Sequence, residues 1–274
     1  MSLLLGIDFE HIYHTPAYRA LDSSPEILID LETITERLLD LLDRHNSQAT
    51  FFVVADLAEE YPELIRRITA AGHEIASHTL SHPSLPSEDR SRKQREIRRS
   101  KEILERISGS TVTGFRAPTF QVDDEVYSLL AESGYQYSTS VAPCLPIPGF
   151  YSNTYDFTEP TIITTPSDSI DEIPIAVNPL MRLPVSGAWT RLFGRTYTLK
   201  SIEVLLERDR PVLTYVHPWE FTALWETPLP FRNRFRTGEW LFETYERLLK
   251  TAESITVSEF VASTQPTVEY ELGQ

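Results

Sequence analysis

Two histidines four positions apart, His78 and His82, are the residues of this chain best suited to metal chemistry. A neutral imidazole offers a ring nitrogen to divalent cations, and histidine is a frequent ligand of zinc, nickel and cobalt. The upstream acids Asp8 and Glu10 could complete the ligand set, and a third histidine, His217, lies far downstream. Together these residues predict a metal site with acid and base groups beside it. The alternative is an incidental pair, because the chain holds seven histidines.

The reactive residues follow segments that we expect to be strands. β-rich runs alternate with helical stretches, which is typical of βα units around a parallel sheet. Predicted strands at 3–9, 73–77, 112–115 and 212–216 end at or just before Asp8, His78, Arg116 and His217. Active sites of α/β barrels and parallel sheets assemble at this edge. Incidental histidines would not produce this arrangement.

Strand geometry also relates the two upstream acids. Side chains two positions apart point to the same face of a strand, so Asp8 and Glu10 face one way if the alternation continues past Phe9. One carboxylate could then bind metal while the other transfers protons.

Length and composition favour one α/β domain over residues 1–274, with a loop-rich insertion around 143–197. Hydrophobic residues make up 41% of the chain, which is enough for a sizeable core. No Gly-rich phosphate loop follows the first strand, and this counts against a nucleotide-binding fold.

Charge and cysteine content restrict the partners. The net charge of −15 argues against nucleic acid or anionic lipid as the main partner. A single cysteine, Cys144, excludes an internal disulfide and a thiolate-rich zinc cage, so a metal must be held by nitrogen and oxygen. No apolar run approaches the roughly 18 residues of a membrane span, and residues 2–7 are too short for a signal peptide. We therefore expect a cytoplasmic protein; the sequence leaves a homo-oligomer open.

The chemistry follows from these residue types. A metal held by Glu10, His78 and His82 would activate water and polarise a substrate carbonyl. Asp8 would take the proton of that water, and Arg116 would orient Asp8 through a bidentate pair. His217 would protonate a leaving amine. The predicted reaction is hydrolysis of an amide or ester.

Four motifs in order resemble the polysaccharide deacetylase superfamily, the NodB homology domain of carbohydrate esterase family 4. They are Asp8-Phe9-Glu10, His-Thr-Leu-Ser-His at 78–82, Arg-Ala-Pro-Thr-Phe at 116–120 and Leu-Thr-Tyr-Val-His-Pro-Trp at 213–219. The resemblance spans about residues 3–257. It implies a single distorted (β/α) barrel, for which we expect seven strands, and metal-dependent removal of acetyl from an N-acetylated sugar. Zinc is the expected metal, with cobalt or nickel as alternatives.

The resemblance also implies a role for each matching residue. Asp8 corresponds to the base, His78 and His82 to metal ligands, and His217 to the acid. Arg116 corresponds to the residue that positions the base, and the backbone N–H of Thr119 to part of an oxyanion hole.

Two departures from the family pattern leave roles open. The usual first motif has adjacent aspartates, the second of which binds metal, whereas Phe9 separates the acids here. Some branches of the superfamily space these two acids by one residue, and Glu10 is similar to the metal ligand of those branches. Asp8 as the ligand stays an alternative. In the fourth motif Ser138 stands where an aspartate is usual, so another residue, for which Glu172 is a candidate, must orient Arg116.

Aromatic side chains near the predicted rim could stack on sugar rings. The candidates are Phe120, Trp189 and Trp219, and the alternative for each is packing of the barrel mouth. Arg191 could contact an acidic sugar or a phosphate. His11 and His14 could contact solvent or substrate, or bind metal.

The sequence analysis thus favours a carbohydrate N-deacetylase that uses a divalent metal. Two alternatives stay open. One is a metal-independent hydrolase of cyclic amides, similar to allantoinase-like proteins, and the other is a barrel that only binds carbohydrate.

Overall fold

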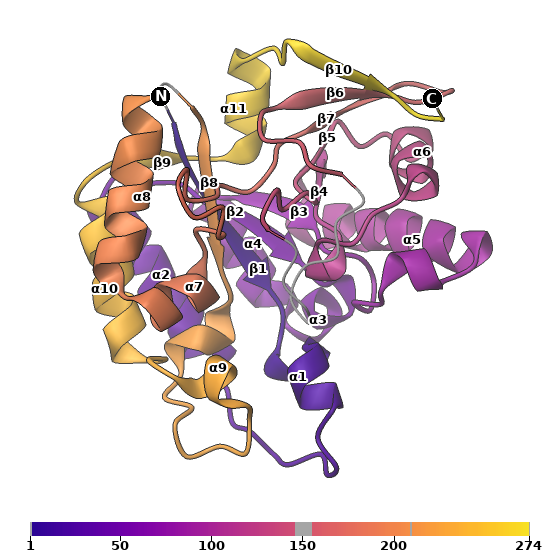
Figure 1. Ribbon diagram of the computed structural model, residues 1–274. Coiled ribbons are helices and arrows are strands. Elements are labelled where there is room, and N and C mark those ends of the chain that lie inside the picture. Colours follow the sequence, from indigo (N-terminus) through magenta and orange to yellow (C-terminus); the bar gives the residue numbers. More distant parts are fainter. Residues whose placement is uncertain (1, 146–154, 209, 274) are drawn as a thin grey trace.

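The computed structural model describes residues 2–145, 155–208 and 210–273 (Figure 1). The strands are β1 (Leu3–Phe9), β2 (Thr50–Val53), β3 (Glu74–Ser77), β4 (Gly114–Phe115), β5 (Tyr137–Ser138), β6 (Thr161–Thr164), β7 (Ser169–Glu172), β8 (Val212–Val216), β9 (Ser254–Ile255) and β10 (Val268–Glu271). The α-helices are α1 (Pro16–Arg19), α2 (Leu31–Arg44), α3 (Ala55–Glu60), α4 (Pro62–Ala70), α5 (Arg90–Ser108), α6 (Asp124–Glu132), α7 (Gly187–Phe193), α8 (Arg195–Glu207), α9 (Phe231–Arg234), α10 (Glu239–Leu249) and α11 (Val257–Ser263). Short 3-10 turns are η1 (Ile12–His14), η2 (Leu85–Ser87), η3 (Pro118–Phe120) and η4 (Pro218–Phe221).

The strands form one mostly parallel sheet. Its order is β10-β6-β7-β5-β4-β3-β2-β1-β8, and β9 also pairs with β1. All neighbours from β7 to β8 along this order are parallel, whereas β6 is antiparallel to β7. This parallel run contains the seven strands that we expected, and β6, β9 and β10 are additions to it.

The sheet curls because the segment after β7 connects its two sides. The N–H of Ile173 donates to Ser138 of β5, and the N–H of Ala176 donates to Leu213 of β8 at 2.8 Å. Ser186 forms a further parallel bridge to Tyr215. The predicted α/β fold with a distorted barrel is therefore confirmed.

The insertion predicted around 143–197 contains β6 and β7, which correspond to the short strands that the sequence predicts at 161–165 and 170–177. The helix α7 in the same segment was not expected. Residues 146–154 lie outside the described part of the chain. A single domain over the whole chain stays a prediction.

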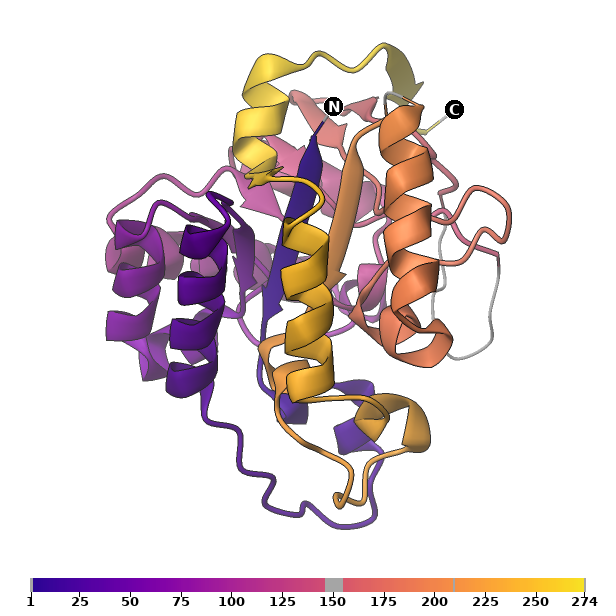
Figure 2. The same cartoon turned by 90° about the vertical axis from the view of Figure 1, so that its left-hand side faces the viewer.

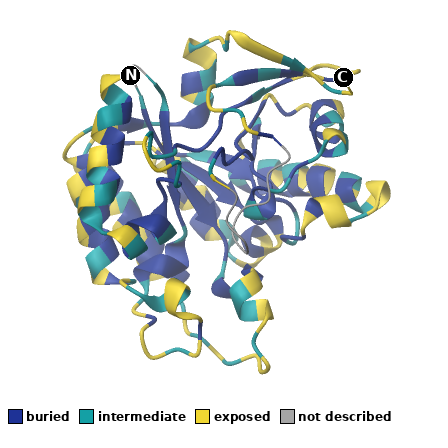
Figure 3. Cartoon of the chain, in the orientation of Figure 1, coloured by how far each residue is buried: buried dark blue, intermediate teal, exposed yellow. Residues whose placement is uncertain are grey.

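Two apolar layers enclose the sheet. One layer lies between strands and helices and includes Phe51 and the buried stripe of α2, while a second contains Phe52, Leu4 and Leu213. Phe51 and Phe52 belong to different layers because neighbouring strand residues point to opposite faces. Figure 2 shows α8 and α10 against β1 and β8. In Figure 3 the central strands are buried, whereas the edge strand β10 is mostly exposed. In the described part of the chain no helix is long and apolar enough to cross a membrane.

The parallel arrangement determines where the reactive side chains meet. Strands β1, β3, β4 and β8 end together at one edge of the sheet, since they are mutually parallel along the order. Asp8 is the penultimate residue of β1, and His78, Arg116 and His217 directly follow β3, β4 and β8. The fold thus brings to one rim residues that are up to 209 positions apart.

Candidate active site

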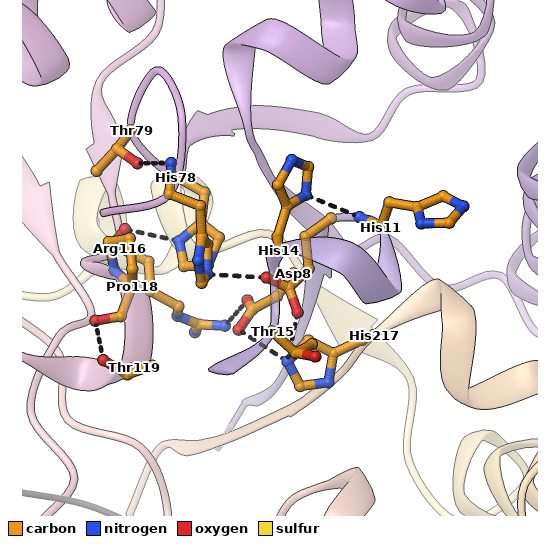
Figure 4. A network of polar contacts seen from close by, with 12 residues as sticks. Asp8, His11, His14, Thr15, His78, Thr79, Arg116, Pro118, Thr119 and His217 are labelled. Atoms are coloured by element: carbon orange, nitrogen blue, oxygen red, sulfur yellow. Dashed lines mark hydrogen bonds and ion pairs between the residues drawn. The ribbon is translucent and has the colours of Figure 1, made fainter. Parts of the chain in front are cut away.

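A pocket opens where these strands end. Most predicted site residues line it, namely Asp8, Glu10, His78, His82, Thr119, Phe120, His217 and Trp219. Arg116 is fully buried and reaches the pocket through Asp8. Figure 4 shows the side chains of Asp8, Arg116 and His217 pointing toward one another.

Glu10, His78 and His82 form a cluster with the spacing of metal ligands. Their ligand atoms lie within 4.8 Å of one another, and Glu10 Oε2 is 2.8 Å from His82 Nε2. Among the described residues, this buried Glu10 oxygen has no polar partner besides His82. No other group of three such side chains lies this close within the described ranges. The side chains therefore fit a bound divalent metal.

The charge states of this cluster suit metal binding. His78 Nδ1 lies 2.8 Å from the carbonyl oxygen of Arg116, so that its N–H donates there and Nε2 stays available. Burial lowers the pKa of His78 to about 4, which keeps the ring neutral at pH 7. Burial would raise the pKa of Glu10, but the neighbouring His82 outweighs this and lowers it well below its usual value. At neutral pH the site thus offers one carboxylate and a neutral imidazole.

Asp8 is occupied by a different partner. Arg116 Nη1 donates to Asp8 Oδ1, and both side chains are buried. The guanidinium lies 3.9 Å from the centre of the Phe52 ring. A Cβ atom at Gly6 would come within 2.8 Å of Arg116 Nη1, so this close approach requires glycine. Asp8 is not a member of the three-residue ligand cluster, which favours Glu10 over Asp8 as the carboxylate ligand.

Glu172, which we suggested as the residue that orients Arg116, does not contact Arg116 directly. Arg116 Nε donates to Thr139 Oγ1 at 2.8 Å and lies 3.3 Å from the Thr139 carbonyl oxygen. Glu172 instead accepts hydrogen bonds from the backbone of Ser140 and Val141. Thr139 was not predicted because its contact with Arg116 depends on the pairing of β4 and β5, which the local sequence does not show.

His217 is held by a carboxylate that sequence reasoning missed. Its Nδ1 lies 2.8 Å from Glu220 Oε1, and its backbone N–H donates to the same oxygen. Its Nε2 lies 3.9 Å from Asp8 Oδ2 and 3.7 Å from Glu10 Oε1. Burial alone would lower the pKa of His217, but Glu220, Glu10 and Asp8 outweigh burial and raise it to about 9. His217 therefore carries a proton at neutral pH.

Arg191 and Gly187 hold Glu220 in place. Burial would raise the pKa of Glu220, but Arg191, whose Nε is 2.6 Å from Glu220 Oε2, and His217 lower it to about 2. A Cβ atom at Gly187 would come within 2.5 Å of Glu220 Oε1. Arg191 is thus committed to a protein carboxylate, which does not support the suggested contact to an acidic sugar. Glu220 lies three residues after His217, a spacing that resembles a capping box. This spacing is the feature of the sequence that could have identified Glu220 as the partner of His217.

The predicted substrate-contacting residues separate into two groups. Phe120 and Trp219 line the pocket, although both are almost fully buried. The Trp219 indole N–H donates to Glu10 Oε1 at 3.2 Å, and its ring stacks on His217. Trp189 is not among the pocket-lining residues, because it is buried in α7 with its ring stacked on Phe193. The structure does not support Trp189 as a sugar contact.

Thr119 lines the pocket, and His14 lies beside the ligand cluster. Thr119 has a φ of 54°, a left-handed conformation that is unfavourable for a β-branched residue and is found at functional sites. The ring of His14 stacks on His82 with centroids 5.9 Å apart, and its Nδ1 accepts the backbone N–H of His11. His11 and His14 lie outside the ligand cluster.

Comparisons with known proteins agree with this geometry. Residues 17–138 match the family model for polysaccharide deacetylase, and residues 140–264 match a domain of unknown function (DUF3473). Residues 17–138 are thus a region of polysaccharide deacetylase (NodB) homology. A peptidoglycan-N-acetylglucosamine deacetylase of Bacillus cereus is 39% identical over 89 residues, 32% of this chain and 32% of the relative. A chitooligosaccharide deacetylase of Azorhizobium caulinodans is 31% identical over 113 residues, 40% of this chain and 54% of the relative.

Solved structures show that the deacetylase fold extends over nearly the whole chain. A Mycobacterium smegmatis protein assigned as a polysaccharide deacetylase superposes with a TM-score of 0.70 at 20% identity, covering 97% of this chain and 95% of that one. A Bacillus anthracis pseudoenzyme of carbohydrate esterase family 4 gives a TM-score of 0.57 at 12% identity, covering 98% and 69%. Because a pseudoenzyme shares the fold, the site residues must carry the argument for activity.

The two matched regions each supply part of the site. His78, His82 and Arg116 belong to the deacetylase region, whereas His217 and its partner Glu220 belong to the region of unknown function. Neither matched region alone contains both the histidine cluster and the histidine–carboxylate pair.

We expect replacement of Glu10, His78 or His82 by alanine to lower sharply the amount of zinc that the purified protein binds when zinc is supplied. Each change deletes one of three clustered ligand atoms, and a rim site contributes little to core packing. His14→Ala is the matched control, since His14 stacks on His82 without joining the cluster. Metal content measured by atomic emission should fall in the three ligand variants and stay unchanged in the control. Equal metal content in all four variants would contradict the assignment.

Proposed function

We propose that this protein is a metal-dependent hydrolase that removes acetyl from an N-acetylated sugar in a polysaccharide or glycoconjugate. The observation that carries the proposal is the convergence in one pocket of a Glu-His-His cluster, the Asp8–Arg116 pair and the His217–Glu220 pair. The names of the Bacillus cereus and Azorhizobium caulinodans relatives, both deacetylases of N-acetylated sugars, support the substrate class.

Glu10, His78 and His82 hold the divalent metal in this proposal. Zinc fits a site of one carboxylate and two imidazoles, and cobalt or nickel would suit the same ligands. When bound, the metal lowers the pKa of a coordinated water and polarises the substrate carbonyl. The remaining chemistry falls to the protein side chains.

Asp8 acts as the base. Arg116 holds Oδ1, while Oδ2 lies on the side of the pocket where His217 Nε2 is 3.9 Å away. Arg116 balances the buried charge of the carboxylate, so Asp8 can accept a proton from the attacking water without leaving its position. The backbone N–H of Thr119 stabilises the oxygen that becomes negative after attack.

His217 acts as the acid. With a pKa of about 9 it is protonated at neutral pH, and Nε2 faces the two acids while Nδ1 is tied to Glu220. The proton available for the leaving amine is therefore the one on Nε2. Glu220 fixes the ring orientation and balances the charge of the imidazolium.

Acetate release tests the proposed function directly. We expect the zinc-loaded protein to release acetate from chitooligosaccharides or peptidoglycan fragments, with loss of activity after chelation and recovery when zinc is added back. The His78→Ala protein, purified and incubated with zinc in the same way, is the control for contaminating activity. Binding of these glycans without acetate release would instead favour the non-catalytic alternative.

A second experiment tests the acid. His217→Ala should reduce deacetylation of an N-acetyl sugar by about 10²- to 10⁴-fold, because the amine leaving group needs a proton. Hydrolysis of an activated aryl acetate should suffer far less, since its leaving group departs as an anion. Both rates should be measured at equal zinc content. Equal losses of rate for the two substrates would show that His217 is not the acid.

A further inference from the structure

Glu172 is a fully buried carboxylate that the proposed chemistry does not use. It lies at the end of β7, in the region of unknown function, and is not among the pocket-lining residues. Its Oε1 accepts the backbone N–H groups of Ser140 at 2.7 Å and Val141 at 2.9 Å, and its Oε2 accepts the Tyr127 hydroxyl at 2.9 Å. Three donors therefore converge on one side chain.

The segment that Glu172 binds follows β5 and is fixed on its other side as well. The N–H of Thr139 donates to the Phe115 carbonyl at 2.9 Å, and Ser140 Oγ accepts the N–H of Ala117 at 2.9 Å. These two contacts join the segment to the residues on both sides of Arg116. Residues 138–141 thus lie between Glu172 and the strand that carries the arginine.

Thr139 makes the contact that matters for the base. Its Oγ1 and carbonyl oxygen both face Arg116 Nε, at 2.8 and 3.3 Å, while Arg116 Nη1 donates to Asp8. Glu172 is therefore linked to Asp8 by its hydrogen bond to Ser140, the peptide bond between Ser140 and Thr139, and the hydrogen bonds of Arg116 to Thr139 and Asp8. Each member is buried, so water does not compete for these donors and acceptors.

We propose that Glu172 is a positioning residue for Asp8, acting through residues 138–141 and the Arg116 guanidinium. This inference rests on the proposed function, in which Asp8 is the base. A charged acceptor binds backbone N–H groups more strongly than a neutral one, so Glu172 holds Thr139 where Arg116 needs it. The region of unknown function would then fix the base as well as supply the acid.

The test uses two variants with matched controls. Thr139→Val removes the hydroxyl acceptor at nearly constant shape, and Thr139→Ser keeps it. Glu172→Met removes both carboxylate oxygens, and Glu172→Gln keeps one oxygen for the N–H groups of Ser140 and Val141. We expect Thr139→Val and Glu172→Met each to lower kcat by about 10- to 100-fold, because small misplacement of catalytic groups has effects of this size. KM and zinc content should stay unchanged, and both controls should recover most of the rate.

The double variant provides the decisive comparison. If both residues act through Arg116, Thr139→Val combined with Glu172→Met should lose little more than either change alone. The proposal would be overturned if the double variant lost kcat by the product of the two single losses, or if kcat were unchanged in the folded single variants.

Hydrogen exchange of the Arg116 Nε–H, followed by NMR, provides a readout that does not depend on turnover. This exchange should accelerate in Thr139→Val and Glu172→Met but not in their controls. Slow exchange of the Arg116 Nε–H in all four variants would overturn the positioning role of Glu172. Wild-type protein that releases no acetate would overturn only the proposed function.

Discussion

The buried ion pair between Arg116 and Asp8 is the interaction on which the site depends. Removing two charges from water is costly, so such a pair persists only where the surroundings satisfy it. Here Thr139 accepts a hydrogen bond from the guanidinium, Phe52 covers its face and Gly6 leaves space for it. Because Arg116 engages Asp8, the two acids at the end of β1 have different partners. In the proposed function Asp8 serves as the base, and Glu10 joins the two histidines.

Much of the fold could be predicted because strand patterns are local. The bounds of β1 and β8 agree with the predicted runs at 3–9 and 212–216, since both strands are mostly apolar and fully buried. Parallel pairing then required their C-terminal ends to meet, which brought Asp8 and His217 to one rim. The short helix α7 was not foreseen, because seven residues with one glycine and two aromatic residues show no clear helical period.

The partners of the reactive residues were harder to predict than the residues themselves. A hydrogen-bond partner is chosen by tertiary distance, so Thr139 next to Arg116 and Arg191 next to Glu220 had no counterpart in local spacing. Glu172 was correctly singled out as a nearby acid but was assigned the wrong contact. The structure also gives the region of unknown function a role in the proposed function, since His217 and Glu220 belong to it.

The central claim is that Asp8 is the base and Glu10 is the metal ligand, and one variant tests it most directly. In Asp8→Asn the side chain keeps its shape and a hydrogen-bond acceptor for Arg116 but loses its ability to take a proton. Zinc content and acetate release should be measured on the same purified sample. Our account predicts full zinc occupancy together with loss of nearly all turnover. Loss of zinc from Asp8→Asn, with metal retained in Glu10→Ala, would contradict it and make Asp8 the ligand.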